Sequence, residues 1–247
     1  MHYDVIICDV DGCLADENGG PFDMPRLLQL AEYNVRAQRE AAGPPLTVCT
    51  GRPEPFAEAL CRLLANDTLP AIAENGAWLF FPRDNRYELD PAITPDDLEY
   101  VHAAAKLLDG KYRSTGVQQQ PGKKAAVSLY HPRPEFLQQI APEIREMFTA
   151  RGWPFRVSMT WNYINCDLAH VSKASGLRRF FAATGIDPSR TAAIGDTMSD
   201  LAMAEVAAWF ACPANASDEI KQHADYVSPH AEVAGVIDIV ERLSRSS

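Results

Sequence analysis

The strongest constraint on the fold is an alternation along the chain. Short, unbroken apolar runs are followed by longer segments in which apolar residues recur at helical spacing. The run Val5-Ile6-Ile7-Cys8 has no polar interruption, as expected of a strand covered on both faces. The alternation is typical of an α/β fold, in which a Rossmann-like, mainly parallel sheet lies between layers of helices.

The expected elements follow this rhythm at both ends of the chain. In the first part we expect strands near residues 3–9, 46–50 and 71–73, with helices at 25–42 and 54–64. After Ser172 the rhythm returns, with a helix to residue 183, strands at 191–194 and 208–211, and a closing helix at 233–243.

Between residues 84 and 168 the rhythm changes, because long polar connections separate two helices from alternating strands at 125–130, 154–158 and 163–168. Thr94 and Asp97 have the spacing of a capping box, which predicts a helix to about Leu108. A second helix is expected around 136–148, where Pro142 should kink it or cut it short. We interpret 84–168 as an inserted α+β cap domain, and 1–83 with 169–247 as a discontinuous catalytic core.

Polar residues cluster where three predicted core strands end. Asp9 and Asp11 follow the first strand. The triplet Thr50-Gly51-Arg52 follows the second, and the stretch from Gly195 to Asp200 follows a later one. Lys173 opens the helix that returns to the core. Because open parallel sheets bind ligands at the carboxyl ends of their strands, we expect these groups to converge.

A converged site would contain four carboxylates, those of Asp9, Asp11, Asp196 and Asp200. Two like charges about 4 Å apart repel by ~4 kcal/mol at an effective dielectric constant near 20, so such a site needs a cation. Mg²⁺ fits best, because it accepts a few carboxylates and completes its shell with water and substrate phosphate. With Lys173 as a further cation the site suits phosphoryl transfer, in which a carboxylate can be the nucleophile.

These four motifs, in this order, resemble those of the haloacid dehalogenase superfamily of phosphatases. The insertion between the second and third motifs resembles the members with a large α/β cap. Those members include Cof-type phosphatases, sugar-phosphate phosphatases and archaeal-type phosphoglycolate phosphatases. The stretches Glu74-Asn75-Gly76-Ala77 and Cys212-Pro213-Ala214-Asn215-Ala216 are also similar to that branch.

The resemblance implies roles for individual residues. Asp9 would attack phosphorus, and Asp11 would protonate the leaving oxygen and then activate water. Thr50 and Lys173 would hold phosphoryl oxygens. The implied Mg²⁺ ligands are Asp9, the main-chain carbonyl of Asp11, and Asp196, with Asp200 as a ligand or as support.

Further substrate-binding candidates are Gly51, Arg52, Asn75 and Lys124. For Arg52, an ion pair inside the protein is an equal alternative to a contact with substrate. For Lys124, a solvated position on the surface is an equal alternative. Two residues depart from the family pattern, Cys13 where Thr is usual and Ser199 where Asn is frequent; we expect altered loop contacts there and not a loss of chemistry.

The net charge of −10 argues against a general binder of nucleic acid or of acidic membranes. The apolar run that starts at Val5 is too short for a signal peptide or a membrane span. Six dispersed cysteines without a Cys-x-x-Cys pair agree with reduced thiols. We therefore expect a cytoplasmic phosphatase that acts on a small phosphorylated metabolite, with no nucleic-acid or membrane partner; the oligomeric state is not predicted.

Three alternatives stay open at this point. The first is phosphotransfer between sugar phosphates of the phosphomannomutase kind. The second is a phospho-signalling receiver, which also surrounds an aspartate with acidic residues, Mg²⁺, a hydroxyl and a lysine, although an insertion of this size does not suit a receiver. The third is a binding protein that keeps the pocket without turnover.

Overall fold

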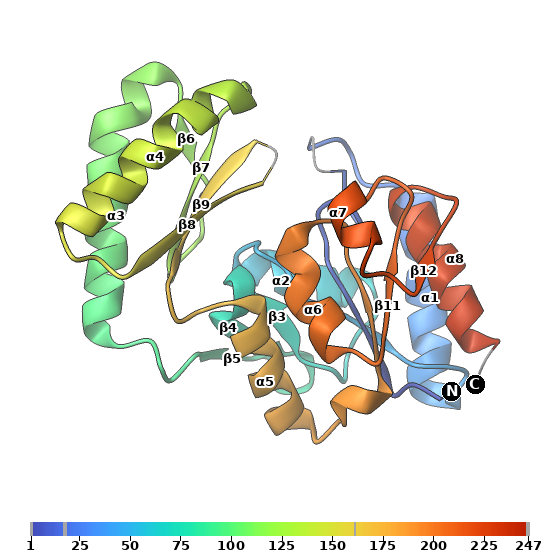
Figure 1. Cartoon of the computed structure of the whole chain (residues 1–247). Coiled ribbons are helices and arrows are strands. Elements are labelled where there is room, and N and C mark those ends of the chain that lie inside the picture. The colour runs from blue at the N-terminus through green and yellow to red at the C-terminus, as the bar shows by residue number, and fades with distance from the viewer. Residues whose placement is uncertain (1, 17–18, 161, 246–247) are drawn as a thin grey trace. The chain divides into compact units, whose positions relative to one another are not determined.

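The computed structural model describes residues 2–16, 19–160 and 162–245, and it divides the chain into two compact units (Figure 1). Met1–Glu88 and Lys173–Ser247 form the first unit, and Leu89–Ser172 forms the second. Both boundaries lie a few residues beyond the expected ones. The first lies later because the strand Arg86–Leu89 belongs to a sheet of the first unit. The role of the second unit as a cap stays a prediction.

The first unit is built on a five-stranded sheet in the order β12-β11-β10-β1-β2, and every neighbouring pair is parallel. Its strands are β1 (Val5–Cys8), β2 (Leu46–Val48), β10 (Thr191–Ile194), β11 (Trp209–Cys212) and β12 (Tyr226–Val227). Ile7 pairs with Ala193 on one side and with Thr47 on the other, so β1 lies inside the sheet. The predicted α/β fold with a parallel core is confirmed.

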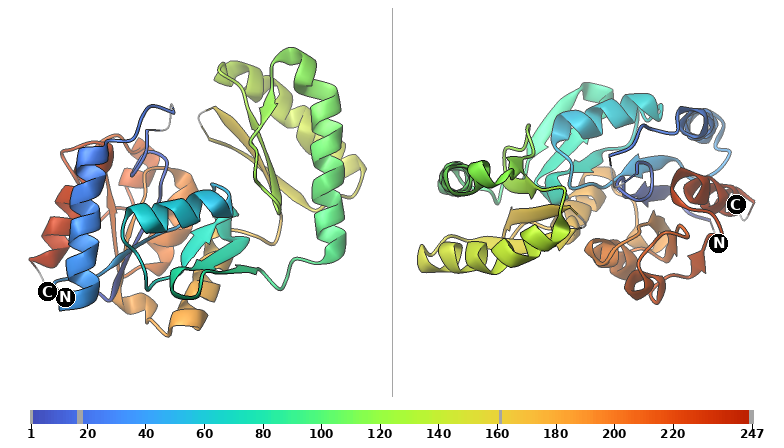
Figure 2. Two further views of the ribbon diagram at one scale, coloured as in Figure 1. Left: turned by 180° about the vertical axis from the view of Figure 1, so that it is seen from behind. Right: turned by 90° about the horizontal axis from the view of Figure 1, so that it is seen from above.

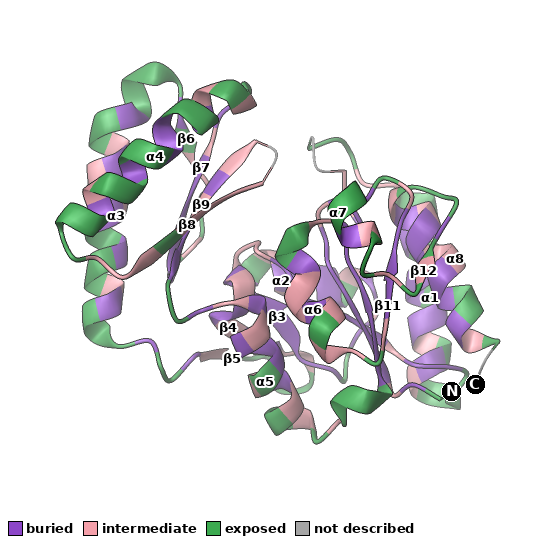
Figure 3. Ribbon diagram, in the orientation of Figure 1, coloured by how far each residue is buried: buried purple, intermediate pink, exposed green. Residues whose placement is uncertain are grey.

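Helices cover both faces of this sheet, as an all-parallel sheet requires. Alternate residues of β1 enter different apolar clusters: Ile6 packs in one and Ile7 in the other. The first cluster includes residues of α1 (Met24–Glu40), α2 (Glu54–Leu63) and α8 (Glu232–Ser244). The second includes residues of α5 (Lys173–Thr184), α6 (Leu201–Val206) and α7 (Asp218–Lys221). In Figure 2, α1 and α8 lie side by side on one face, and Figure 3 shows that burial is concentrated on the strands between the helix layers.

A second, three-stranded sheet in the same unit was only partly predicted. It contains β3 (Ala71–Ala73), β4 (Trp78–Phe81) and β5 (Arg86–Leu89), in that order. The 3₁₀ turns η1 (Glu74–Gly76) and η2 (Pro82–Asp84) join them. The apolar run of β4 is only four residues long and pairs back on β3 across a turn, so no long-range periodicity marks it in the sequence.

The second unit has a four-stranded antiparallel sheet in the order β6-β7-β9-β8, with two long helices. Its elements are α3 (Pro95–Tyr112), η3 (Arg113–Thr115), β6 (Gln118–Gln119), β7 (Ala126–Tyr130), α4 (Pro134–Ala150), β8 (Phe155–Thr160) and β9 (Tyr163–Leu168). Apolar Val127 pairs with Cys166, and the next row places the polar pair Ser128 and Asn165 opposite one another, with Ser128 buried as well. This alternation gives the sheet one apolar and one polar face.

Two predictions about the helices of this unit have different outcomes. The capping box of Thr94 and Asp97 is present, and it begins α3 as expected. Pro142, however, does not cut α4 short, because the helix continues to Ala150. Pro142 is exposed, while Ile140 and Ile144 on either side of it are buried and hold the helix on the sheet. In the described part of the chain, no helix combines the length and the apolar character that a membrane span needs.

Candidate active site

The polar residues that follow three parallel strands meet at one edge of the main sheet. Asp9 comes directly after β1, and its backbone N–H donates to the carbonyl of Ile194 at 2.9 Å. Thr50 follows β2 and Asp196 follows β10, and both side chains are buried. The parallel topology therefore delivers these groups to the same place, as the sequence predicted.

A compact carboxylate cluster lies at this edge. One carboxylate oxygen from each of Asp9, Asp196 and Asp200 lies within 4.8 Å of the others, and all three residues are buried. Lys173, the first residue of α5, reaches into the cluster. Its Nζ lies 2.9 Å from Asp9 Oδ1 and 2.6 Å from Asp200 Oδ1. A single ammonium group thus neutralises part of the charge of three carboxylates.

The electrostatics of the cluster follow from its burial. Loss of solvation, with repulsion from Asp200, raises the pKa of Asp9 to about 7, although Lys173 acts in the opposite direction. Burial alone would lower the pKa of Lys173, but attraction to Asp200 and Asp9 raises it well above its ordinary value. Lys173 is therefore a permanent cation, and the carboxylates still lack positive charge.

Asp200 holds its neighbours in place through hydrogen bonds to both of its carboxylate oxygens. Its Oδ2 accepts hydrogen bonds from the backbone N–H groups of Asp196 at 3.0 Å and Thr197 at 3.1 Å, while its Oδ1 accepts from Lys173. Both oxygens are thus engaged inside the protein. Gly195 makes this possible, because a Cβ there would lie 2.5 Å from Asp200 Cβ. Asp200 fits a supporting role better than that of a direct metal ligand.

The donor set suits a hard divalent cation. It consists of carboxylate oxygens, and oxygen donors of this kind bind Mg²⁺ or Ca²⁺. Gly12 has a φ of +80°, and a Cβ on it would lie 2.0 Å from Asp196 Oδ2. Glycine at this position therefore lets the loop after Asp11 approach the Asp196 carboxylate.

Arg52 clamps the carboxylate of Asp11. Its Nε lies 2.9 and 3.0 Å from the two carboxylate oxygens, and its Nη2 lies 2.5 Å from Oδ1. Both side chains are partly exposed, at 21% for Arg52 and 30% for Asp11. Of the two roles that the sequence left open for Arg52, this structure shows the ion pair. It fixes the position of the residue expected to act as acid and base.

The loop after β2 is fastened to the turn at Asn75. The backbone N–H of Asn75 donates to the carbonyl of Thr50 at 3.0 Å, and Thr50 Oγ1 accepts from the N–H of Arg52 at 3.1 Å. Asn75 has a left-handed φ of +53°, and a Cβ on Gly51 would lie 3.0 Å from its Oδ1. Gly51 and Asn75 therefore lie beside Thr50, as their assignment to one site requires.

Comparison with known proteins adds an independent observation. The family model described as haloacid dehalogenase-like hydrolase matches residues 117–240, which is half of the chain. The chain belongs to the haloacid dehalogenase-like hydrolases. The family predicted from the four motifs is confirmed, and with it the prediction that the chain is a phosphatase.

Curated relatives of this hydrolase extend over nearly its whole length. The phosphoglycolate phosphatase of Methanothermobacter thermautotrophicus is 29% identical over 237 residues, which are 96% of this chain and 97% of the relative. That of Methanosarcina acetivorans is 27% identical, covering 98% of this chain and 97% of the relative.

Solved structures share the fold of the hydrolase. Protein 0175 of Thermoplasma acidophilum has a TM-score of 0.75 at 18% identity, covering 98% of this chain and 99% of that one. The sucrose-phosphatase of Synechocystis sp. PCC6803, solved with sucrose and phosphate, has a TM-score of 0.68 at 16% identity, covering 98% of both chains. At these identities the likeness shows the fold alone.

One residue at the site of this hydrolase was not assigned a role from the sequence. Asn215 Nδ2 donates to the carbonyl of Gly12 at 2.8 Å, and its Oδ1 accepts from the backbone N–H of Glu232 at 2.8 Å. Its side chain thus ties the loop after Asp11 to the start of α8. The stretch 212–216 was noted for its resemblance to the family, but a contact across 203 residues has no local signal.

Three further expected features lie outside the cluster. Cys13, where the family usually has Thr, is fully buried and packs in the apolar core. Ser199 is exposed, and its Oγ lies 2.9 Å from Thr197 Oγ1. Lys124 belongs to the second unit, where it is exposed, so its role toward substrate stays a prediction.

Proposed function

We propose that this phosphatase is a Mg²⁺-dependent phosphomonoester hydrolase that uses Asp9 as its nucleophile and acts on a small phosphorylated metabolite. The observation that carries the proposal is the buried cluster in which the Lys173 ammonium lies within hydrogen-bond distance of the Asp9 and Asp200 carboxylates, with the Asp196 carboxylate beside them. Few other reactions need a carboxylate nucleophile, a fixed cation and a divalent metal site within one hydrogen-bonded cluster.

The metal would be held by Asp9, the main-chain carbonyl of Asp11, and Asp196, with Asp200 orienting its neighbours. When bound, Mg²⁺ supplies positive charge to the phosphoryl oxygens and so lets a dianion approach a group of carboxylates. Mg²⁺ is preferred over Ca²⁺ because the protein offers few ligands, and Mg²⁺ completes its shell with water and phosphate.

Asp9 and Asp11 divide the covalent step and the proton transfers between them. Asp9 attacks phosphorus and forms an acyl phosphate, while Asp11 gives its proton to the departing alkoxide. Asp11 then takes a proton from water as that water attacks phosphorus, which releases inorganic phosphate and restores the Asp9 carboxylate. Lys173 and Thr50 hold phosphoryl oxygens. Arg52 engages both carboxylate oxygens of Asp11 in this structure, so it has to release one of them before Asp11 carries and gives a proton.

Phosphoglycolate is the first substrate to test, because relatives that match almost the whole chain are named phosphoglycolate phosphatases. Sugar phosphates come second, because the fold is also that of a sucrose-phosphatase. Gly51, Asn75 and Lys124 are the proposed further contacts to substrate. Phosphotransfer between sugar phosphates remains the alternative.

The test is phosphate release from phosphoglycolate, hexose and triose phosphates, phosphoglycerates, nucleotides and an aryl phosphate, with Mg²⁺ and with chelator. We expect Mg²⁺-dependent release with a clear preference, and its abolition in Asp9→Asn. The matched control is Asp84→Asn, an exposed aspartate of the same unit, which should keep full activity. Normal turnover by pure, folded Asp9→Asn would refute the proposed nucleophile. Isomerised sugar phosphate without released phosphate would support the alternative.

A further inference from the structure

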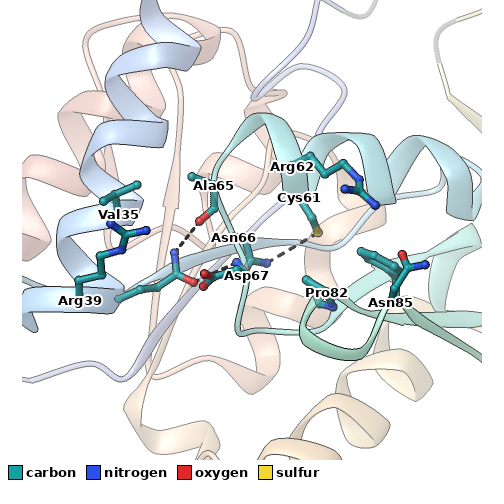
Figure 4. Close-up of a pocket in the computed structure, with 11 residues that line it drawn as sticks. Val35, Arg39, Cys61, Arg62, Ala65, Asn66, Asp67, Pro82 and Asn85 are labelled. Atoms are coloured by element: carbon teal, nitrogen blue, oxygen red, sulfur yellow. Dashed lines mark hydrogen bonds between the residues drawn. The ribbon is translucent and has the colours of Figure 1, made fainter.

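A pocket of about 450 Å³ lies within the first unit, away from the carboxylate cluster. Residues of α1 and α2, of the turn after α2, and of the segment from β4 to Asn85 surround it (Figure 4). Its volume falls in the range of about 300–1,000 Å³ that is usual for small-molecule sites. Nothing in the proposed reaction uses this pocket.

One part of the lining is apolar. Val35 of α1, Phe80 of β4 and Pro82 of η2 contribute carbon surface. Cys61 of α2 adds its thiol, which is 2% exposed. Burial raises the pKa of this thiol to about 12, so the sulfur stays neutral and belongs to the apolar lining. The pocket can therefore receive the hydrocarbon body of a ligand.

Two amide side chains make another part of the lining rigid. Gln38 Nε2 donates to the carbonyls of Asn34 and Ala65 at 3.0 and 2.8 Å, and its Oε1 accepts from Thr68 Oγ1 at 2.7 Å. Asn66 Nδ2 donates to the carbonyl of Leu69 at 2.9 Å, and its Oδ1 accepts from the N–H of the same residue at 3.0 Å. Because these amides are engaged inside the protein, the pocket is preformed and needs no rearrangement to admit a ligand.

Other side chains of the lining have hydrogen-bond donors that are available to a ligand. Among the described residues, no hydrogen bond or ion pair engages the guanidinium of Arg39, and none engages the side-chain amide of Asn85. Arg62 pairs with Glu58 through Nε, which leaves its two terminal nitrogens. Arg39 and Arg62 lie on different sides of the pocket in Figure 4. Glu58 compensates the charge of Arg62, and the lining contains the acid Asp67, so Arg39 is the lining arginine without an ion pair among the described residues.

We infer that this pocket binds a small organic acid with a single negative charge and an apolar body, such as a carboxylate on a ring or a branched chain. The carboxylate lies at Arg39, and the body lies against Val35, Phe80 and Pro82. A single charge is specified because Asp67 repels a dianion, which separates this ligand from the phosphorylated substrate.

The pocket is separate from the phosphate site. The two lie at opposite ends of α2, which begins two residues after Arg52 and has Cys61 and Arg62 in its last turn. A helix of ten residues is about 15 Å long. Both ligands can therefore be bound at once.

The probe is indole-3-acetate, and its charge control is the neutral indole-3-acetamide; both are titrated calorimetrically into the full chain. We expect the acid to bind about tenfold more tightly than the amide, because its carboxylate accepts a charge-assisted hydrogen bond from Arg39. Arg39→Gln should remove this preference. Arg36→Gln changes an exposed arginine of the same helix that does not line the pocket, and should keep it.

Two further measurements locate the probe. Val35→Trp should fill the pocket and abolish binding, with the circular dichroism spectrum as the check on folding. Saturating Mg²⁺ and inorganic phosphate should leave the affinity for indole-3-acetate unchanged. The inference would be overturned if the acid and the amide bound equally, or if Arg39→Gln and Arg36→Gln had equal effects. It would also be overturned by the absence of measurable binding at millimolar indole-3-acetate, or by competition from phosphate.

Discussion

The two units of the chain place polar side chains in different ways. In the first, the reactive groups follow the ends of parallel strands, so the backbone topology brings Asp9, Thr50 and Asp196 together. All three are buried, and the two aspartates are charged groups that depend on their neighbours for compensation. A substitution of one of them therefore changes the electrostatic environment of the others.

In the second unit the polar groups alternate along antiparallel strands. Lys123 Nζ donates to Ser128 Oγ at 2.5 Å, Ser128 donates to Asn165 Oδ1 at 2.6 Å, and Asn165 Nδ2 donates to Thr160 Oγ1 at 3.3 Å. Most of these groups are neutral, and they project from the face opposite the apolar residues. If the second unit is the cap that we predict, such neutral polar groups would be the ones that contact the leaving group of the substrate.

The largest effect is expected at Lys173. Lys173→Met removes the cation between two buried carboxylates, so the free energy of unfolding should fall by about 3–5 kcal/mol. Phosphate release should fall by about 10²- to 10³-fold, because a donor to the transferred group is lost. Urea unfolding and turnover measure both. The control is Lys221→Met, which breaks an ion pair to the exposed Asp218 and should alter neither the free energy of unfolding nor turnover. Equal effects of the two variants would contradict the expected dependence of the buried charges on one another.

The next effect concerns pH. The raised pKa of Asp9, about 7 against 3.8, means that the metal-free native state holds a proton that the unfolded chain has lost, so Asp9 costs stability increasingly from about pH 4 to pH 7. Relative to wild type with chelator, Asp9→Asn should gain about 2–3 kcal/mol in its free energy of unfolding between pH 5 and pH 8, since one pKa unit is about 1.4 kcal/mol. If the difference in unfolding free energy between Asp9→Asn and wild type is constant with pH, burial does not raise the pKa of this carboxylate.

A smaller effect is expected at Asn215. Asn215→Ala frees the carbonyl of Gly12, so the loop that bears Asp11 loses its tie to α8. We expect kcat and the apparent affinity for Mg²⁺ to fall by about 10- to 100-fold, with KM nearly unchanged. Gln222→Ala, at an exposed position, is the control. A loss of thermal stability with an unchanged Mg²⁺ titration would assign Asn215 a merely structural role.

The smallest effect is expected in the second unit. Ser128→Ala interrupts the hydrogen-bonded row, and the proposed cap role predicts a few-fold rise in KM for the preferred substrate with hydrolysis of a small aryl phosphate unchanged. Thr149→Ala, on an exposed helical turn of the same unit, should change neither value. A fall in kcat for every substrate would mean that this face contributes to the chemistry.

The sequence predicts the parts of the molecule that have local signals. Buried strands are marked by unbroken apolar runs, and because parallel strands end at one edge, the convergence of Asp9, Thr50 and Asp196 follows from the order of the elements. The start of α3 was predicted for the same reason, since a capping box spans four residues.

What the sequence does not predict are pairings between distant side chains. The clamp between Arg52 and Asp11 joins residues 41 positions apart, and nothing in either neighbourhood distinguishes it from a contact to substrate. The continuation of α4 past Pro142 depends on the apolar surface beneath it, which overrides the local penalty of proline.

The position of β1 within the sheet has a consequence for the growing chain. Its neighbour β10 lies far along the sequence, and Asp4 and Arg190, next to the two strands, are paired across 186 residues. The proposed nucleophile Asp9 thus precedes the entire second unit along the chain, whereas Lys173, Asp196 and Asp200 follow it. A growing chain that has just completed that unit therefore holds Asp9 without Lys173, Asp196 and Asp200, so the proposed reaction has to wait until the closing segment is made and docks.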